Sequence, residues 1–166
     1  MLLLPFSNGG VINSKASQSA KIMHGQLVHV ALAILYRQDQ FLLQLRDNIP
    51  GINYPGHWGL FGGHLEPGET PAIAVERELI EEICYTPPVL LEFGCYFDSR
   101  VVRHVYHAPL TVEIDTLVLQ EGWDMGLLTQ QQIRQGSSYS AKAGHVLPLA
   151  PPPQQILLDF INKPIS

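Results

Sequence analysis

Apolar residues gather in short runs along the first half of the chain, and polar turns separate these runs. Residues 27–36 form a nearly continuous apolar run of strand length, and a second run over residues 41–46 follows the polar residues 37–40. This spacing predicts two strands joined by a tight turn. Residues 47–63 contain two prolines and five glycines, which predicts a long loop with at most a short strand at residues 58–61.

The clearest helix begins after Thr70. The Thr70 hydroxyl can accept backbone N–H groups as an N-cap, and Pro71 suits the first helical position. Residues 72–83 contain neither glycine nor proline, and the proline pair at 87–88 prevents the helix from continuing. We expect an apolar stripe of this helix to pack on a sheet, and the stripe comprises Ala72, Val75, Leu79 and Ile83, with Ile73 and Ile80 beside it.

Shorter apolar segments fill the rest of the chain. They predict strands at residues 89–98, 100–113 and 116–120, a helix at 130–135 capped by Thr129, a proline linker at 151–153 and a last helix at 154–161. The order of two strands, a helix, three strands and two helices indicates an α+β fold, in which helices pack against a mixed sheet.

The first 25 residues differ in composition from the rest. Glycine, serine, asparagine and glutamine are frequent between residues 6 and 26, as they are in linkers. We therefore expect an N-terminal extension over residues 1–25 and one domain over residues 26–166. The extension would pack on the domain or on a second copy of the chain, and the second case makes the protein a homodimer.

Charge and composition exclude several classes of protein. The 166 residues include 10 lysines and arginines against 15 aspartates and glutamates, for a net charge of −5, so we expect no nucleic-acid binding. Apolar runs stay shorter than the roughly 18 residues of a membrane span, so we expect no membrane segment. The two cysteines, Cys84 and Cys95, lack a CxxC spacing and fit a reducing cytoplasm.

Three glutamates share one face of the predicted helix. Glu78 stands three and four positions before Glu81 and Glu82, and such positions are neighbours on a helix surface. Because like charges repel, the cluster is either a solvated acidic face or a binding site for a cation. Carboxylate oxygens select hard ions such as Mg²⁺ or Mn²⁺. An acidic protein with an anionic ligand also needs a cation between the two.

Residues 63–85 read GHLEPGETPAIAVERELIEEICY, and this stretch resembles the signature of the Nudix hydrolases. The signature consists of Gly, five residues, Glu, seven residues, Arg-Glu, an aliphatic residue, any residue, Glu-Glu, any residue, Gly and an aliphatic residue. Every charged position matches, as does the first glycine. Cys84 replaces the second glycine, which removes an easy left-handed C-cap at a cost of about 1 kcal/mol, and Tyr85 replaces the last aliphatic residue.

The resemblance implies a Nudix-like α/β/α sandwich with a mixed β-sheet between helices, and it implies roles for the signature residues. Glu69 and Arg77 would form a supporting pair that fastens the loop to the helix. Mg²⁺, with Mn²⁺ as an alternative, would be bound by the catalytic carboxylates and one carbonyl: Glu78, Glu81, Glu82 and the backbone oxygen of Gly63.

The implied reaction is hydrolysis of the pyrophosphate bond in a small nucleoside diphosphate derivative, either a sugar nucleotide or a (d)NTP. Glu78 is the first candidate for the general base, with Glu113 and Glu121 as the others. The alternative function is a noncatalytic Nudix module that senses a nucleotide ligand.

The glycine-rich loop supplies the expected substrate-binding residues. Gly62 and Gly63 let the backbone approach metal or phosphate closely, and Arg46 can pair with a phosphate. Trp58 can stack on a base, as can Tyr54. Packing in the core is the alternative role for these aromatic side chains.

Overall fold

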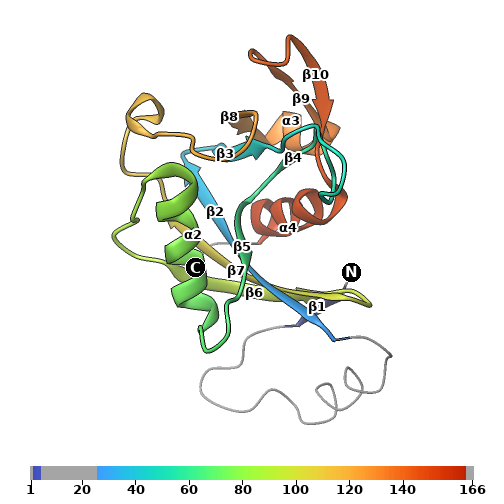
Figure 1. Cartoon of the computed structure of the whole chain (residues 1–166). Coiled ribbons are helices and arrows are strands. Elements are labelled where there is room, and N and C mark those ends of the chain that lie inside the picture. Colours follow the sequence, from blue (N-terminus) through green and yellow to red (C-terminus); the bar gives the residue numbers. More distant parts are fainter. Residues whose placement is uncertain (1, 5–25, 164–166) are drawn as a thin grey trace.

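A mixed sheet organises the residues that the computed structural model describes, namely 2–4 and 26–163 (Figure 1). The sheet has eight strands, and its main path runs β1-β6-β7-β2-β3-β4, with β5 paired to β2 and β8 paired to β3. The strands are β1 (Leu2–Leu4), β2 (Val28–Arg37), β3 (Gln40–Leu45), β4 (Trp58–Gly59), β5 (Phe61–His64), β6 (Leu91–Phe97), β7 (Val101–Pro109) and β8 (Asp124–Thr129).

Strand β2 is the centre of this sheet. One edge of β2 pairs with β7 in parallel from Val28 to Tyr36, and the other edge is shared by two antiparallel strands. Strand β3 pairs with residues 35–37 of β2, whereas β5 pairs with residues 30–33. The predicted tight turn between the first two strands is confirmed, and Gln38 adopts a positive φ of 52° in it.

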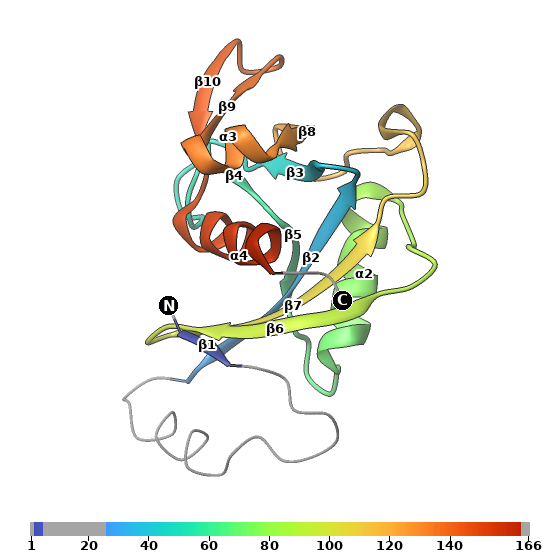
Figure 2. The ribbon, with the colours of Figure 1, turned by 180° about the vertical axis from the view of Figure 1, so that it is seen from behind.

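Helices cover both faces of the sheet, as the two opposite views show (Figures 1 and 2). Helix α2 (Pro71–Ile83) covers one face through Ala74, Val75 and Leu79, and helix α4 (Pro151–Asn162) covers the other through Ile156 and Leu157. The expected α+β fold with a mixed sheet between helices is therefore confirmed. No helix in the described part of the chain is long and apolar enough to span a bilayer.

Several predicted boundaries were wrong. The expected strand at 116–120 is absent from the described residues, and that stretch contains the end of a short 3-10 helix, η1 (Ile114–Thr116). Strand β7 ends at Pro109, which has no backbone N–H to donate. The proline linker at 151–153 is the first turn of α4, where missing N–H groups cost nothing.

The C-terminal third holds a short helix and a hairpin. Helix α3 (Gln130–Gln135) begins at the predicted cap, because Thr129 accepts from the Gln132 backbone N–H at 3.2 Å. The antiparallel pair of β9 (Ser137–Ser140) and β10 (His145–Pro148) was missed, since serines give a weak strand signal. This hairpin projects from the body of the molecule (Figure 1).

The buried face of α2 differs from the predicted stripe. Ala72, Ile73 and Ile80 are exposed, whereas Ala74 and Glu82 are buried with Val75, Leu79 and Ile83. The helix is rotated so that a row containing a carboxylate faces β5, and hydrophobicity alone does not predict this orientation. Its start is as expected, because the Ile73 backbone N–H donates to Thr70 Oγ1 at 3.3 Å.

The predicted N-terminal extension lies largely outside the described residues. Its only described segment, β1, pairs antiparallel with β6 from Leu2 opposite Phe97 to Leu4 opposite Cys95. The division of the chain at residue 25 therefore stays a prediction.

Cys84 ends α2 in the left-handed conformation that the missing glycine would favour. Its φ is 53° and its ψ is 38°, and its backbone N–H donates to the Ile80 carbonyl at 3.0 Å. The adjacent Tyr85 is buried in the core under α2, and its hydroxyl lies 3.0 Å from Thr111 Oγ1. The helix end is thus kept, with strain at one residue.

We predict that Cys84→Gly raises the free energy of unfolding by about 1 kcal/mol, because glycine adopts this backbone conformation without a Cβ clash. Urea denaturation measures the change. Gly136→Ala at the left-handed end of α3, where φ is 76°, should change stability in the opposite direction. A Cys84→Gly variant no more stable than the wild type would contradict this explanation.

The imidazole of His104 on β7 lies in surroundings that disfavour its protonated form. Its Nε2 lies 3.1 Å from Nδ1 of His29 on β2, and burial together with the nearby His29 lowers the pKa of His104 from 6.5 to about 4. The His104 imidazole therefore binds a proton less readily in the folded protein than in the unfolded chain.

We predict that the free energy of unfolding falls as the pH falls from 6.5 to 4, by at most about 1.4 kcal/mol per pH unit from this group. The sign follows because the unfolded state binds more protons in that window. Urea denaturation at pH 7 and pH 5 measures the slope, and His104→Phe should reduce it. An equal slope in that variant would refute the assignment to His104.

Candidate active site

Helix α2 presents two glutamates to the glycine strand β5. A Cβ placed on Gly63 would lie only 2.6 Å from Glu78 Cδ, so the Glu78 carboxylate occupies the space that any other side chain would need. Gly62 has a positive φ of 134°, and a Cβ there would lie 2.9 Å from Leu32 Cα. Both glycines are therefore required for β5 to pass between β2 and the helix.

Glu82 is the most deeply buried acid of the described residues, with 4% of its surface exposed. Its Oε2 accepts from the Gly62 backbone N–H at 2.8 Å, and its Oε1 accepts from Gln44 Nε2 at 3.2 Å. Burial raises the pKa of Glu82 to about 8. The hydrogen bonds from Gly62 and Gln44 act to lower this pKa, whereas the negative charges of Glu78 and Glu121 act to raise it. Burial likewise raises the pKa of Glu78. These carboxylates favour a nearby positive charge.

Arg77 fastens the loop before α2 to the helix, and the predicted pair with Glu69 is confirmed. Arg77 Nε donates to Glu69 Oε1 at 2.7 Å, and Nη2 donates to Glu69 Oε2 at 3.1 Å and to the His64 carbonyl at 3.0 Å. Glu69 also accepts from the Glu66 backbone N–H at 2.8 Å. The Arg77 guanidinium accordingly lowers the pKa of Glu69.

The same guanidinium also pairs with two of the three signature glutamates. Arg77 Nη1 donates to Glu78 Oε1 at 2.9 Å and to Glu81 Oε2 at 3.1 Å, while Glu82 faces Gln44 and Gly62. Glu78 and Glu81 thus share one donor, whereas Glu82 has its own partners. Within residues 2–4 and 26–163, no three Asp, Glu, His or Cys side chains stand in a metal-binding group, and metal ligation by these residues stays a prediction.

The loop between η1 and β8 brings a fourth glutamate to this place. The Gln120 backbone N–H donates to the Glu82 carbonyl at 2.8 Å, and the charge of the next residue, Glu121, raises the pKa values of Glu78 and Glu82. Glu113, in contrast, is exposed and pairs with Arg37 at 3.0 Å. Of the two outlying candidates for the general base, only Glu121 is therefore near the helix carboxylates.

The predicted role of Trp58 in substrate binding is wrong. Trp58 is 1% exposed, lies in the core under α4, and donates through Nε1 to the Ser138 carbonyl at 3.1 Å. Trp58 is buried because its ring packs among the apolar side chains of this core. Arg46 is partly exposed and donates through Nε to the Asn53 carbonyl at 2.7 Å, which braces its loop. A role for Arg46, Gly62 or Gly63 in binding substrate stays a prediction.

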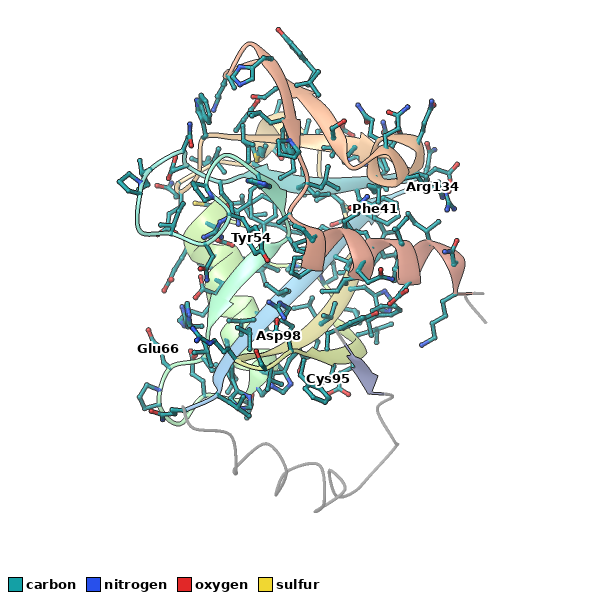
Figure 3. All side chains as sticks on the ribbon, turned by 90° about the vertical axis from the view of Figure 1, so that its right-hand side faces the viewer. Phe41, Tyr54, Glu66, Cys95, Asp98 and Arg134 are labelled. Carbon is teal, nitrogen blue, oxygen red and sulfur yellow. The ribbon has the colours of Figure 1, made fainter. Side chains whose placement is uncertain are left out.

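A cavity of about 420 Å³ lies beside this loop. Figure 3 shows Tyr54 and Asp98 near the start of α4. Tyr54 is 41% exposed, and Asp159 accepts from the Tyr96 hydroxyl at 3.0 Å. The lining residues are Tyr54, Tyr96, Asp98, Pro151, Pro152, Gln155 and Asp159.

Gln44 is the residue of this site that the sequence did not reveal. It is a single polar residue inside the apolar run of β3, and its side chain reaches the Glu82 carboxylate from the sheet. An isolated polar residue in a strand of buried neighbours is a signal that could have identified it.

Comparisons with known proteins agree with this architecture. The sequence profile of the NUDIX domain matches residues 26–144. The NUDIX domain of Shewanella oneidensis NrtR, solved as a complex with ADP ribose, superposes with a TM-score of 0.63 at 22% identity, covering 90% of this chain and 97% of that one. The MutT NUDIX hydrolase of Burkholderia pseudomallei gives 0.62 at 22% identity, covering 81% and 98%. At such identities these structures share the fold.

A curated relative is more similar in sequence over a shorter stretch. The isopentenyl-diphosphate Delta-isomerase of Streptomyces griseus is 33% identical over 95 residues, which cover 57% of this chain and 48% of that protein. The match thus spans about half the length of this relative.

We predict that Arg77→Met lowers the free energy of unfolding by about 2 kcal/mol, because it removes the guanidinium donors of the Glu69 carboxylate and of the His64 carbonyl. Urea denaturation measures the loss. The control is Arg134→Met, which removes one exposed bond of 3.3 Å to Asn162 and should change stability by less than about 0.5 kcal/mol. Equal effects of the two substitutions would contradict a supporting role for Arg77.

Proposed function

Because the chain belongs to the NUDIX domain family, we propose that it is a Mg²⁺-dependent pyrophosphohydrolase of a nucleoside diphosphate linked to another moiety. The observation that carries this proposal is the buried carboxylate of Glu82 and the partly buried carboxylate of Glu78, both against strand β5. Carboxylates removed from water favour a cation, and a diphosphate needs the same cation to approach them.

The donor set at this place suits a hard divalent ion. It offers the carboxylates of Glu78 and Glu82 and the backbone carbonyl of Gly63, with Glu81 one turn away on the same helix. All are oxygen ligands, which Mg²⁺ and Mn²⁺ prefer. When bound, Mg²⁺ would supply neutralisation of the pyrophosphate oxygens and activation of the attacking water.

The residues of the chain would orient and complete the reaction. A water oxygen forms a bond to phosphorus, the bridging P–O bond on the opposite side breaks, and the proton of the water passes to a carboxylate. Because Gly62 and Gly63 have no side chains, the backbone of β5 lies directly against the Glu82 and Glu78 carboxylates. Arg77 stays bonded to Glu69, so the helix and the loop before it keep their relative position.

Glu78 is our first candidate for the general base, and Glu121 is the second. Glu121 follows Gln120, which is bonded to the end of α2, and its charge acts on both helix carboxylates. A general base in this loop would lie on a different element from the proposed metal ligands, which are on α2 and β5.

The cavity between the 46–57 loop and α4 lies against the helix on the face of the sheet opposite α2, and it is a second proposed binding place, for a group that carries no phosphate. Asp98 and Asp159 give its wall negative charge, which disfavours phosphate and favours groups that donate hydrogen bonds. Tyr54 offers a partly exposed aromatic ring to a flat group. A base or a sugar has these properties.

The experiment described below also distinguishes two other functions. The relative named as an isopentenyl-diphosphate Delta-isomerase suggests rearrangement of a diphosphate substrate without cleavage. A noncatalytic module that senses a nucleotide is the other. We also propose that the protein is cytoplasmic, that residues 26–166 form one domain, and that the protein is a homodimer. Light scattering tests the dimer.

We predict that the purified protein with Mg²⁺ cleaves one class in a panel of sugar nucleotides, dinucleotides and (d)NTPs. Phosphate that appears only after alkaline phosphatase identifies a sugar nucleotide or a dinucleotide, whereas pyrophosphate identifies a (d)NTP. Glu82→Gln should lower kcat by about a hundredfold or more, because the change removes a negative charge from the site.

Glu113→Gln is the matched control, since it removes an exposed carboxylate that pairs with Arg37. It should leave kcat within about twofold of the wild type. Full turnover by a folded Glu82→Gln variant would refute the assignment. Conversion of isopentenyl diphosphate without phosphate release would favour the isomerase, and tight nucleotide binding without turnover would favour the sensor.

A further inference from the structure

Gln44 is a buried polar side chain in an otherwise apolar strand. It is 5% exposed, and its neighbours in β3, Leu43 and Leu45, are fully buried. An amide removed from water destabilises a protein unless its hydrogen-bonding groups find partners. The partners of Gln44 therefore explain why a glutamine can occupy this position.

Hydrogen bonding fixes the orientation of the Gln44 amide. Its Nε2 donates to the Leu60 carbonyl at 3.3 Å and to Glu82 Oε1 at 3.2 Å. Because the Leu60 carbonyl can only accept, the Gln44 nitrogen has to face it, and the same nitrogen then reaches Glu82. The Gln44 oxygen then points toward the loop that carries Glu121, since a Cβ placed on Gly122 would lie 3.2 Å from Oε1.

Gln44 thus touches three of the elements that form the site. Leu60 immediately precedes β5, Glu82 is on α2, and Gly122 follows Glu121. The Gly62 N–H holds the second oxygen of Glu82 at 2.8 Å. Glu82 is therefore held at each oxygen by a donor from the sheet side, and removal of Gln44 frees one of them.

We propose that Gln44 is a positioning residue that fixes the Glu82 carboxylate in the orientation required for cation binding and turnover. This inference rests on the function proposed above. A merely structural role for Gln44 would change stability but not the affinity of the folded protein for a divalent ion.

The test compares Gln44→Met with Gln154→Met. Gln154 is a matched control, because its Nε2 also donates to a backbone carbonyl, that of Ile133 at 2.9 Å, and also lies against a glycine, Gly136. Titration with Mn²⁺ alone, followed by electron paramagnetic resonance of the free ion, measures affinity without substrate. We expect about tenfold weaker Mn²⁺ binding for Gln44→Met and wild-type affinity for Gln154→Met.

Kinetics and a double variant complete the test. Gln44→Met should lower kcat by about tenfold with a smaller change in KM, and it should have no further effect on Mn²⁺ binding in a Glu82→Gln background. If Gln44→Met does not fold, Gln44→Leu replaces it. A wild-type protein that neither binds Mn²⁺ nor turns over any substrate would refute the proposed function and this inference with it.

Three outcomes would overturn the role of Gln44 alone, in a wild type that binds Mn²⁺. The first is a folded Gln44→Met variant with wild-type affinity and kcat. The second is an equal loss in Gln154→Met, and the third is a loss that persists in the Glu82→Gln background.

Discussion

The cost of removing a carboxylate from water governs this structure. Glu82 occupies a buried position that the periodicity of α2 would give to an apolar residue, and it needs donors from its surroundings. The strand opposite supplies one from a glycine backbone, and β3 supplies another from a buried amide. The two glycines of β5, the orientation of α2 and the polar residue in β3 together accommodate the carboxylates of α2 against the sheet.

Local patterns in the sequence predicted the elements that depend on neighbouring residues. The start of α2 at Thr70 and Pro71, the first hairpin and the cap of α3 all follow from residues within a few positions of each other. The resemblance to the Nudix signature is confirmed by the match of the NUDIX domain to residues 26–144. The pairing of Glu69 with Arg77 came from the same signature and is also confirmed.

Other features depend on contacts between distant residues, and the sequence could not reveal them. Trp58 stands in a loop sequence, yet it is buried because the Ser138 carbonyl and α4 lie over it. Glu113 and Glu121 are equivalent as isolated acids, and only the path of the loop after η1 separates them. The Glu82 partner Gln44 is 38 positions away in sequence.

The parallel pairing of β2 with β7 has a consequence for how the molecule folds. These strands bring together residues such as His29 and His104, which are 75 positions apart, and Gln44, the glycine strand β5 and helix α2 all lie between them in sequence. Such nonlocal pairing gives a high contact order and slow folding. Because loop closure precedes the contacts that stabilise it, a nascent chain has to emerge beyond β7 before its central strand can complete its pairing.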